Sequence, residues 1–412
     1  RGLGDVYKRQ VTPCAISHVA MQRTHDERRN ELPHLAELCA AYGVEPPDET
    51  ASCFYQTLGE FEIRWESHTE FSTYTFIRKT EGNPLRAPTA LSEVPDAWLA
   101  KTPGRATAAL HLAFHAAEGP PDPAELDRYF ERQALRGSVV RQGTAYLYSS
   151  FRLHSDGFAR IALQARDLSP LQAGRLVQRV LEIETYRVMA LLALPVAREV
   201  APEVGAMERE LARINEELTQ AEERTNQQSL LDQLSNLAAR VERMRSDTTY
   251  RFAATNAYFD LVRERNRELT EEKIPGLQPI HVFIKRRLAP GVRTCNAVRD
   301  RLEDLSRRIG QTGSLLRARV ELSIQGQNRE LLASMNRRSE TQLRLQQAVE
   351  GLSVVAITYY LMGLLGYLWG GFVWAGWPWS KKVSFAIAVP LIMLLAWRVI
   401  HGVRRRVEGR SG

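Results

Sequence analysis

The stretch RWESHTEF places four side chains that are able to bind ligands at alternate positions: Arg64, Glu66, His68 and Glu70. Together they could bind a cation or an anionic ligand. Charges at this spacing more often form the solvated face of a strand, and that alternative stays open. We therefore treat the four residues as a candidate cluster for a ligand or ion of unknown identity.

A second candidate is HVFIKRRLAPGVR, in which four basic residues surround a Pro-Gly pair: Lys285, Arg286, Arg287 and Arg293. Such a group could bind a phosphate or a lipid head group. The more common alternative is the solvated end of a helix. The sequence favours the second role without excluding the first.

The other reactive or metal-binding side chains form no recognisable site. His111 and His115 lie on one face of an expected strand, about 13 Å apart, which is too far to share a metal. The cysteines are scattered, lack zinc spacing and indicate reduced cytosolic thiols: Cys14, Cys39, Cys53 and Cys295. Because glycine-rich phosphate loops, HExxH motifs and nucleophile elbows are also absent from the sequence, we expect no enzyme, no bound metal and no cofactor.

Period-two alternation predicts a cytosolic mixed α/β domain over residues 11–168. The stretch FEIRWESHTEFSTYTFIRK, residues 61–79, predicts two strands joined near His68. Alternation at residues 110–114 predicts a third strand, and Asp156-Gly157 between two further alternating runs predicts a hairpin. About five strands are therefore expected.

Helices are expected between and after these strands. The first covers residues 31–42. The second begins at Asp122, in a capping box with Glu125, and the third begins at Ser169, in a capping box with Gln172. The order helix, strands, helix, strands, then helices only, predicts an α+β/α fold.

Residues 169–350 are predicted to form a helical stalk with coiled-coil character, whose first helix reaches about Val200. Apolar residues recur in steps of three and four, as in the seam of a coiled coil. These residues are Met207, Leu211, Ile214, Leu218, Leu230, Leu234, Leu237, Val241, Met244, Val298, Leu302, Leu305 and Ile309. Pro275-Gly276 and Pro290-Gly291 are expected to interrupt the helices.

From Leu315 to Phe372 the chain contains no proline. One helix of about 87 Å could therefore continue into a membrane. The alternative is a series of shorter helices that break near Gly326 and Gly351.

Residues 351–403 contain two apolar segments. The first, Leu352 to Val373, carries no charge and exceeds the ~20 residues that a membrane span needs. The second, Val383 to Val403, can span if Arg398 snorkels to the interface, with Pro390 as a kink. The sequence therefore predicts a C-terminal two-helix transmembrane hairpin.

Basic residues predict that both termini are cytoplasmic and that the hairpin lies in a bacterial inner membrane. The basic residues before the first span are Arg337, Arg338 and Arg344, and those at the end of the second span and beyond it are Arg398, Arg404, Arg405, Arg406 and Arg410. Residues 404–412 form a basic cytosolic tail. The connecting loop carries Lys381, Lys382 and an aromatic belt of Trp374, Trp377 and Trp379. Because the membrane flanks account for most of the net charge of +7, we expect a lipid bilayer as partner and no nucleic acid.

Small residues on the first span recur in steps of three and four: Ala356, Gly363, Gly366 and Gly370, with Tyr359 on the same face. Such a helix-packing seam lets two helices approach closely. It could join copies of the chain into a homo-oligomer or seat the second span of the same chain. Both alternatives stay open.

Several long motifs resemble an uncharacterised bacterial family of membrane-anchored proteins of unknown function: WESHTEFSTYTF, RRLAPGVRTC, QNRELLASMNRRSETQLRLQQAVEGLSVVAITYY and GLLGYL. The resemblance covers nearly the whole chain after about Ser17 and implies no established activity. Residues 1–10, RGLGDVYKRQ, resemble adaptor-derived sequence. We expect them to be non-native and the true N-terminus to be missing.

The expected architecture also resembles the CorA-type metal transporters. Those transporters end the first span with Gly-Met-Asn, where this chain has Gly366-Tyr367-Leu368 as a candidate pore end. Lys381 and Lys382 near the mouth would repel a divalent cation. We therefore expect a membrane-anchored cytosolic scaffold or sensor of unknown ligand. The alternative is an oligomeric CorA-like cation transporter or channel with altered selectivity.

Overall fold

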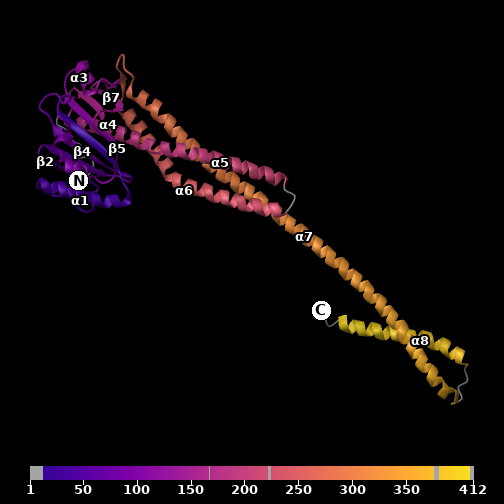
Figure 1. Ribbon diagram of the computed structural model, residues 1–412. Coiled ribbons are helices and arrows are strands. Elements are labelled where there is room, and N and C mark those ends of the chain that lie inside the picture. The colour runs from indigo at the N-terminus through magenta and orange to yellow at the C-terminus, as the bar shows by residue number, and fades with distance from the viewer. Residues whose placement is uncertain (1–12, 167, 221–223, 375–379, 409–412) are drawn as a thin grey trace. The chain divides into compact units, whose positions relative to one another are not determined.

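The computed structural model describes residues 13–166, 168–220, 224–374 and 380–408 (Figure 1). Contacts between residues divide the chain into an α/β unit, Arg1–Ser314, and a C-terminal unit, Leu315–Gly412. This division differs from the expected limits at residues 168 and 350, because helices after residue 168 pack on the sheet. A mixed α/β fold followed by long helices is confirmed.

The α/β unit contains one sheet, whose nine described strands lie in the order β2-β3-β4-β1-β5-β8-β7-β6-β9. All neighbouring strands are antiparallel except β5 and β8, which are parallel. The strands are β1 (Cys14–Gln22), β2 (Cys53–Leu58), β3 (Phe61–Ser67), β4 (Phe71–Lys79), β5 (Arg105–Ala116), β6 (Arg136–Val140), β7 (Ala145–Leu153), β8 (Ala159–Ala165) and β9 (Glu272–Lys273). The expectation of about five strands is therefore wrong, since β1, β2, β6 and β9 are missed.

Strand β1 is missed because it lies inside the sheet, between β4 and β5. Both of its faces are covered, so most of its side chains are buried, including the polar Ser17 and His18. A strand that is buried on both faces shows no alternation of apolar and polar residues. Its sequence, CAISHVAMQ, therefore carries little strand signal.

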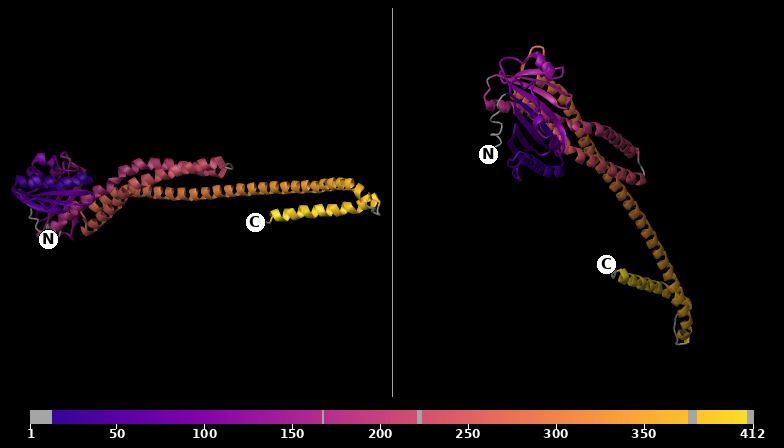
Figure 2. Two further views of the ribbon diagram at one scale, coloured as in Figure 1. Left: turned by 90° about the horizontal axis from the view of Figure 1, so that it is seen from below. Right: turned by 60° about the vertical axis from the view of Figure 1, so that its left-hand side comes forward.

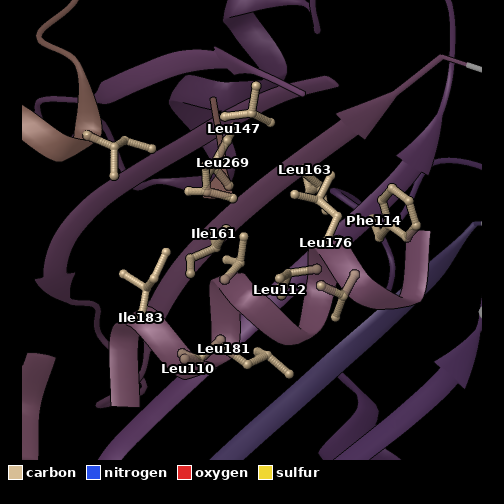
Figure 3. Packing of buried hydrophobic residues seen from close by; sticks show 14 of the residues in the cluster. Leu110, Leu112, Phe114, Leu147, Ile161, Leu163, Leu176, Leu181, Ile183 and Leu269 are labelled. Carbon is tan, nitrogen blue, oxygen red and sulfur yellow. The ribbon is translucent and has the colours of Figure 1, made fainter. Parts of the chain in front are cut away.

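Helix α4 (Pro170–Leu191) covers one face of the sheet (Figure 3). It begins at Ser169, whose side chain and that of Gln172 form the predicted capping box. Leu176 and Leu181 of α4 pack against apolar side chains of β5 and β8: Leu110, Leu112, Ile161 and Leu163. The helix therefore belongs to the core of the α/β unit.

Helices α1 (His25–Ala41) and α3 (Pro123–Tyr129) pack against side chains that the strands direct to the other face. A short 3-10 helix, η1 (Ala90–Glu93), and α2 (Asp96–Leu99) lie with α1. Helix α1 begins earlier than predicted because Thr24 and Glu27 form a capping box there. Asp122 caps α3 as predicted, but Glu125 bonds to the side chains of Asn83 and Arg86, so a capping box at α3 is wrong.

Helices α5 (Ala193–Gln220) and α6 (Arg224–Glu268) lie beside the first part of α7 (Ile280–Trp374) within the α/β unit (Figures 1 and 2). Most residues of the predicted seam are buried: Met207, Leu211, Ile214, Leu230, Leu234, Leu237, Val241, Val298, Leu302, Leu305 and Ile309. Polar pairs join the helices, since Asn256 and Asn296 bond to each other reciprocally and Arg301 forms a two-bond ion pair with Glu208. Supercoiling of these helices stays a prediction.

One expected interruption of the helices is absent. The Pro275-Gly276 turn separates α6 from α7, as predicted, but Pro290 and Gly291 lie inside α7. A Cβ atom at Gly291 would lie 3.0 Å from Leu191 Cδ2, so glycine allows α7 to approach the end of α4 closely. Pro290 has no N–H to donate, and the helix nevertheless continues through it.

The C-terminal unit contains the rest of α7 and helix α8 (Lys381–Glu408). Helix α7 continues through Gly326 and Gly351, so the alternative of shorter helices is wrong. Both helices contain a segment that is long and apolar enough to cross a membrane. Pro390 lies within α8.

The two helices of the C-terminal unit contact each other at Gly366. A Cβ atom at Gly366 would lie 3.8 Å from Phe385 Cζ of α8, and the rings of Trp369 and Phe385 meet edge to face. Gly366 of the predicted seam therefore packs within the chain, whereas a Cβ atom at Gly363 would have no neighbour within 4 Å and Ala356 is exposed.

Several predictions fall outside what the structure describes. They concern Trp377, Trp379, residues 1–10 and the end of the basic tail, the packing of Gly370, and the side chains of Trp374, Lys381 and residues 400–408.

Candidate functional site

The four residues predicted as a ligand cluster lie on and beside the β3–β4 hairpin. Arg64 and Glu66 of β3 form an ion pair, with 5% and 17% of their side chains exposed. Glu70 bonds instead to helix α6, accepting from Tyr258 Oη at 2.9 Å and from Arg251 at 3.2 Å. The ring of His68 stacks on Phe71 at 4.5 Å. Most of these groups therefore already have protein partners.

Sequence reasoning missed Arg23, the residue that bonds to this hairpin turn. Its guanidinium donates to the hydroxyls of Ser67 and Ser72 and to the carbonyl of His68. It also lies 3.1 Å from Glu31 of α1, and both side chains of this ion pair are almost fully buried. Arg23 therefore links the turn to α1, which is a structural role for the charges near His68.

Glu66 and His68 line a small cavity between the sheet and α4, of about 60 Å³. His18 at its wall bonds to the hydroxyls of Thr75 and Thr185, and burial lowers the pKa of His18 to about 3, so the ring is neutral. A water molecule takes up about 30 Å³ in the liquid. This cavity has room for water or a small ion and no room for an organic ligand.

A serine-histidine-acid arrangement lies near the β7–β8 hairpin. The hydroxyl of Ser150 is 3.0 Å from His154 Nε2, and His154 Nδ1 is 3.6 Å from a carboxylate oxygen of Glu131. This is the order of groups in a catalytic triad. Ser150 is only 1% exposed and the His154 side chain is fully buried, so a substrate carbonyl cannot reach the hydroxyl.

His111 has a similar structural environment. Its Nδ1 atom lies 2.8 Å from the Ser17 hydroxyl, and its ring stacks on Phe158 at 4.2 Å. Burial lowers the pKa of His111 to about 4. In the part of the chain that the structure describes, no three metal-binding side chains of His, Cys, Asp or Glu gather into a group that could hold a metal ion.

A larger cavity, of about 490 Å³, lies between the end of α6 and the beginning of α7. Its lining residues are Phe259, Val262, Arg263, Asn266, Arg267, Glu271, His281, Ile284, Lys285 and Ala289. Ligand sites commonly occupy 300–1,000 Å³ and combine apolar walls with a few polar groups. This cavity is therefore the candidate functional site of the α/β unit.

Three basic residues give the cavity a positive rim. Arg263 is 3.5 Å from Asp260 and lies over the ring of Phe259. Arg267 and Lys285 are exposed, and neither forms an ion pair with a residue that the structure describes. Of the predicted basic cluster, Lys285 lines the cavity, Arg287 lies over the ring of Phe283, and Arg286 and Arg293 are exposed.

Glu271 is the acidic residue of the cavity, and its side chain is 3% exposed. One carboxylate oxygen, Oε2, accepts from the Ser138 hydroxyl at 2.7 Å and from the backbone N–H of His281 at 3.1 Å. The same oxygen lies 3.1 Å from His281 Nδ1. The other oxygen, Oε1, is buried and has no hydrogen-bond partner among the described residues.

Residues 6–407 match the model of a family described as protein of unknown function (DUF3422). The chain belongs to the DUF3422 family. The predicted membership of an uncharacterised family is confirmed, and the match begins inside residues 1–10, which we expect to be non-native. No curated protein and no solved structure matches the chain. The likeness to CorA-type transporters stays a prediction.

The cavity of this DUF3422 protein could not be found from sequence motifs. Its lining comes from three places in the chain: the end of α6, the turn around Glu271 and the first turns of α7. The signals in the sequence are the basic residues around Lys285 and the Pro275-Gly276 turn, which returns the chain to α6.

Proposed function

We propose that this protein is a membrane-anchored sensor. In this proposal the α/β unit lies in the cytoplasm and binds a soluble ligand, while the apolar segments of α7 and α8 cross the bacterial inner membrane. The observation that carries the proposal is the continuity of α7. The helix that contributes His281, Ile284 and Lys285 to the cavity also contains the first apolar segment.

The exposed side chains of the C-terminal unit support the membrane anchor. Large apolar or aromatic residues of α7 have more than half of their surface exposed, among them Leu352, Tyr359, Leu364 and Tyr367. A soluble protein rarely exposes a large contiguous apolar surface to water. In a bilayer, lipid chains would surround these residues.

The proposal includes a homo-oligomer. Between Leu315 and Val349, α7 exposes apolar side chains to solvent: Leu315, Leu322, Leu331, Leu332, Met335, Leu343, Leu345 and Val349, each more than half exposed. A single solvated helix gains little stability without an apolar partner. A second copy of α7 would bury these residues, and this supports a scaffold or sensor that acts as an assembly.

Thiol labelling tests the anchor and its orientation. Cys53 is exposed in the α/β unit, whereas Cys14, Cys39 and Cys295 are buried, so Cys53 is a native probe of that unit. We expect a membrane-impermeant maleimide to label Trp377→Cys in intact spheroplasts and to label Cys53 only after lysis. The Cys53→Ser variant controls for background.

Two results would contradict the proposal. Labelling of Cys53 in intact spheroplasts would reverse the orientation. Release of the protein from membranes by alkaline carbonate would remove the anchor.

A further inference from the structure

We infer that the cavity between α6 and the beginning of α7 binds an apolar α-amino acid. This ligand carries a carboxylate, an ammonium group and an apolar side chain, and the cavity presents a counterpart to each. The inference deepens the proposed sensor, on which it rests for its biological role, by naming the chemical class of the ligand.

The rim of the cavity is suited to the carboxylate. Arg267 and Lys285 are exposed, make no ion pair with any described residue and come from opposite walls, α6 and α7. Arginine binds a carboxylate through two parallel hydrogen bonds, and a lysine ammonium adds a charge-assisted bond. Arg263 adds a third positive charge to the same lining.

The buried acceptors of the cavity are suited to the ammonium group. The Ser138 hydroxyl and the backbone N–H of His281 both donate to Glu271 Oε2. Glu271 Oε1 accepts no hydrogen bond from the described residues. Asn266 Oδ1 is also buried without a described partner. Buried polar atoms are normally hydrogen-bonded, and an ammonium group supplies three N–H donors. Both residues line the cavity, so we place the ammonium group of the ligand against them.

The remaining lining is apolar and suited to the side chain of the ligand. Phe259 and Val262 come from α6, and Ile284 and Ala289 come from α7. Contact with these residues removes apolar surface of the ligand from water. The cavity volume of about 490 Å³ accommodates an amino acid of the size of leucine or phenylalanine.

Ligands with only one of the charges fit less well. A simple carboxylate leaves Glu271 Oε1 and Asn266 Oδ1 without donors. A simple amine meets three positive charges and only one negative charge in the lining. The zwitterion is the class that pairs both sets of groups.

Calorimetric titration of the full chain in lipid nanodiscs at neutral pH tests the inference. The probes are L-leucine, 4-methylpentanoate, which lacks the ammonium group, and 3-methylbutylamine, which lacks the carboxylate. We expect leucine to bind, and each of the other two compounds to bind about tenfold more weakly or worse. No binding of leucine, or equal binding of either single-charge analogue, would overturn the inference.

Paired variants locate the site. Arg267→Gln with Lys285→Gln should weaken leucine binding about tenfold or more, because both carboxylate partners are lost. Arg286→Gln with Arg293→Gln is the matched control, since it removes two exposed basic residues of α7 that do not line the cavity. Equal loss in the two pairs would overturn the location.

Glu271→Gln gives a third comparison, with thermal unfolding as the check that α7 is still formed. The substitution should weaken the binding of leucine and leave the weak binding of 4-methylpentanoate unchanged. Unchanged binding of leucine, or an equal loss for both compounds, would contradict the role of Glu271. The titration does not depend on membrane orientation. Binding in nanodiscs together with release of the protein from membranes by alkaline carbonate would leave the site standing and remove the anchor alone.

Discussion

His111 makes the stability of the α/β unit depend on pH. Its ring is buried against Phe158, and burial lowers its pKa from 6.5 to about 4. The unfolded chain therefore binds a proton at higher pH than the folded chain. The stabilisation is fully present above pH 6.5 and is lost as pH falls from 6.5 toward 4.

We expect the unfolding free energy contributed by His111 to fall by about 3 kcal/mol between neutral pH and pH 4. Chemical unfolding followed by tryptophan fluorescence measures it. His111→Asn, which can still bond to Ser17, should flatten the pH dependence. His115→Asn, on the same strand and partly exposed, is the control. An unchanged slope in His111→Asn would contradict the assignment.

Individual side chains were the least predictable part of the candidate site. The spacing of Arg64, Glu66, His68 and Glu70 correctly indicates a hairpin, but a period-two pattern does not reveal which partners reach it from elsewhere. Arg251 and Tyr258, which bind Glu70, follow it by more than 180 residues in the chain. Such partners depend on tertiary packing, which local sequence does not encode.

Elements whose sequence alternates or carries a cap were predictable, and burial did not decide the rest, since the missed strands include the buried β1 and the half-exposed β2. Strands β3, β4, β5, β7 and β8 show alternation, and the cap at Ser169 marks the beginning of α4. Strand β9 has only two residues and pairs with β6 because the turn after α6 returns to the sheet edge. At Pro290 the sequence predicted a break that does not occur, because α7 continues through this residue.

The contact between Gly366 and Phe385 gives a prediction for the helical hairpin. Gly366→Ala should be tolerated, since the added Cβ atom would lie at an ordinary 3.8 Å from the Phe385 ring. Gly366→Leu should overpack the contact and lower stability by about 1–3 kcal/mol. Thermal unfolding in mild detergent measures both.

Phe385→Ala in the Gly366→Leu background provides the control, because it makes room for the larger side chain. We expect it to restore part of the lost stability and the oligomer mass from light scattering to stay the same in all variants. Dissociation of the oligomer by Gly366→Leu alone would show that the glycine seam joins different copies of the chain.

For the whole molecule, the competing hypothesis is a cation transporter. Tyr367, in the candidate pore end Gly366-Tyr367-Leu368, is 91% exposed in a single chain. The sequence places Lys381 and Lys382 after the first apolar segment, and positive charges near a pore mouth disfavour divalent cations. We therefore expect no magnesium flux in liposomes that contain the purified protein, measured with a trapped magnesium-sensitive dye.

Empty liposomes and liposomes with a known magnesium channel are the controls for this assay. Robust magnesium or zinc uptake that Tyr367→Ala reduces and Lys381→Glu increases would establish transport and contradict the sensor. Absence of flux for each cation would agree with α7 and α8 acting as an anchor.

The core of the α/β unit has a consequence for synthesis on the ribosome. One apolar cluster joins Cys14 of β1 to Val292 of α7, so the core cannot close until nearly three hundred residues have been made. Contacts over such separations form slowly, and an incomplete chain leaves Leu147 and Ile161 without their cover from α6 and α7. The first apolar segment begins only at Leu352, after every residue of this cluster. The order of the chain therefore allows this core to be completed before the apolar segments of the C-terminal unit are made.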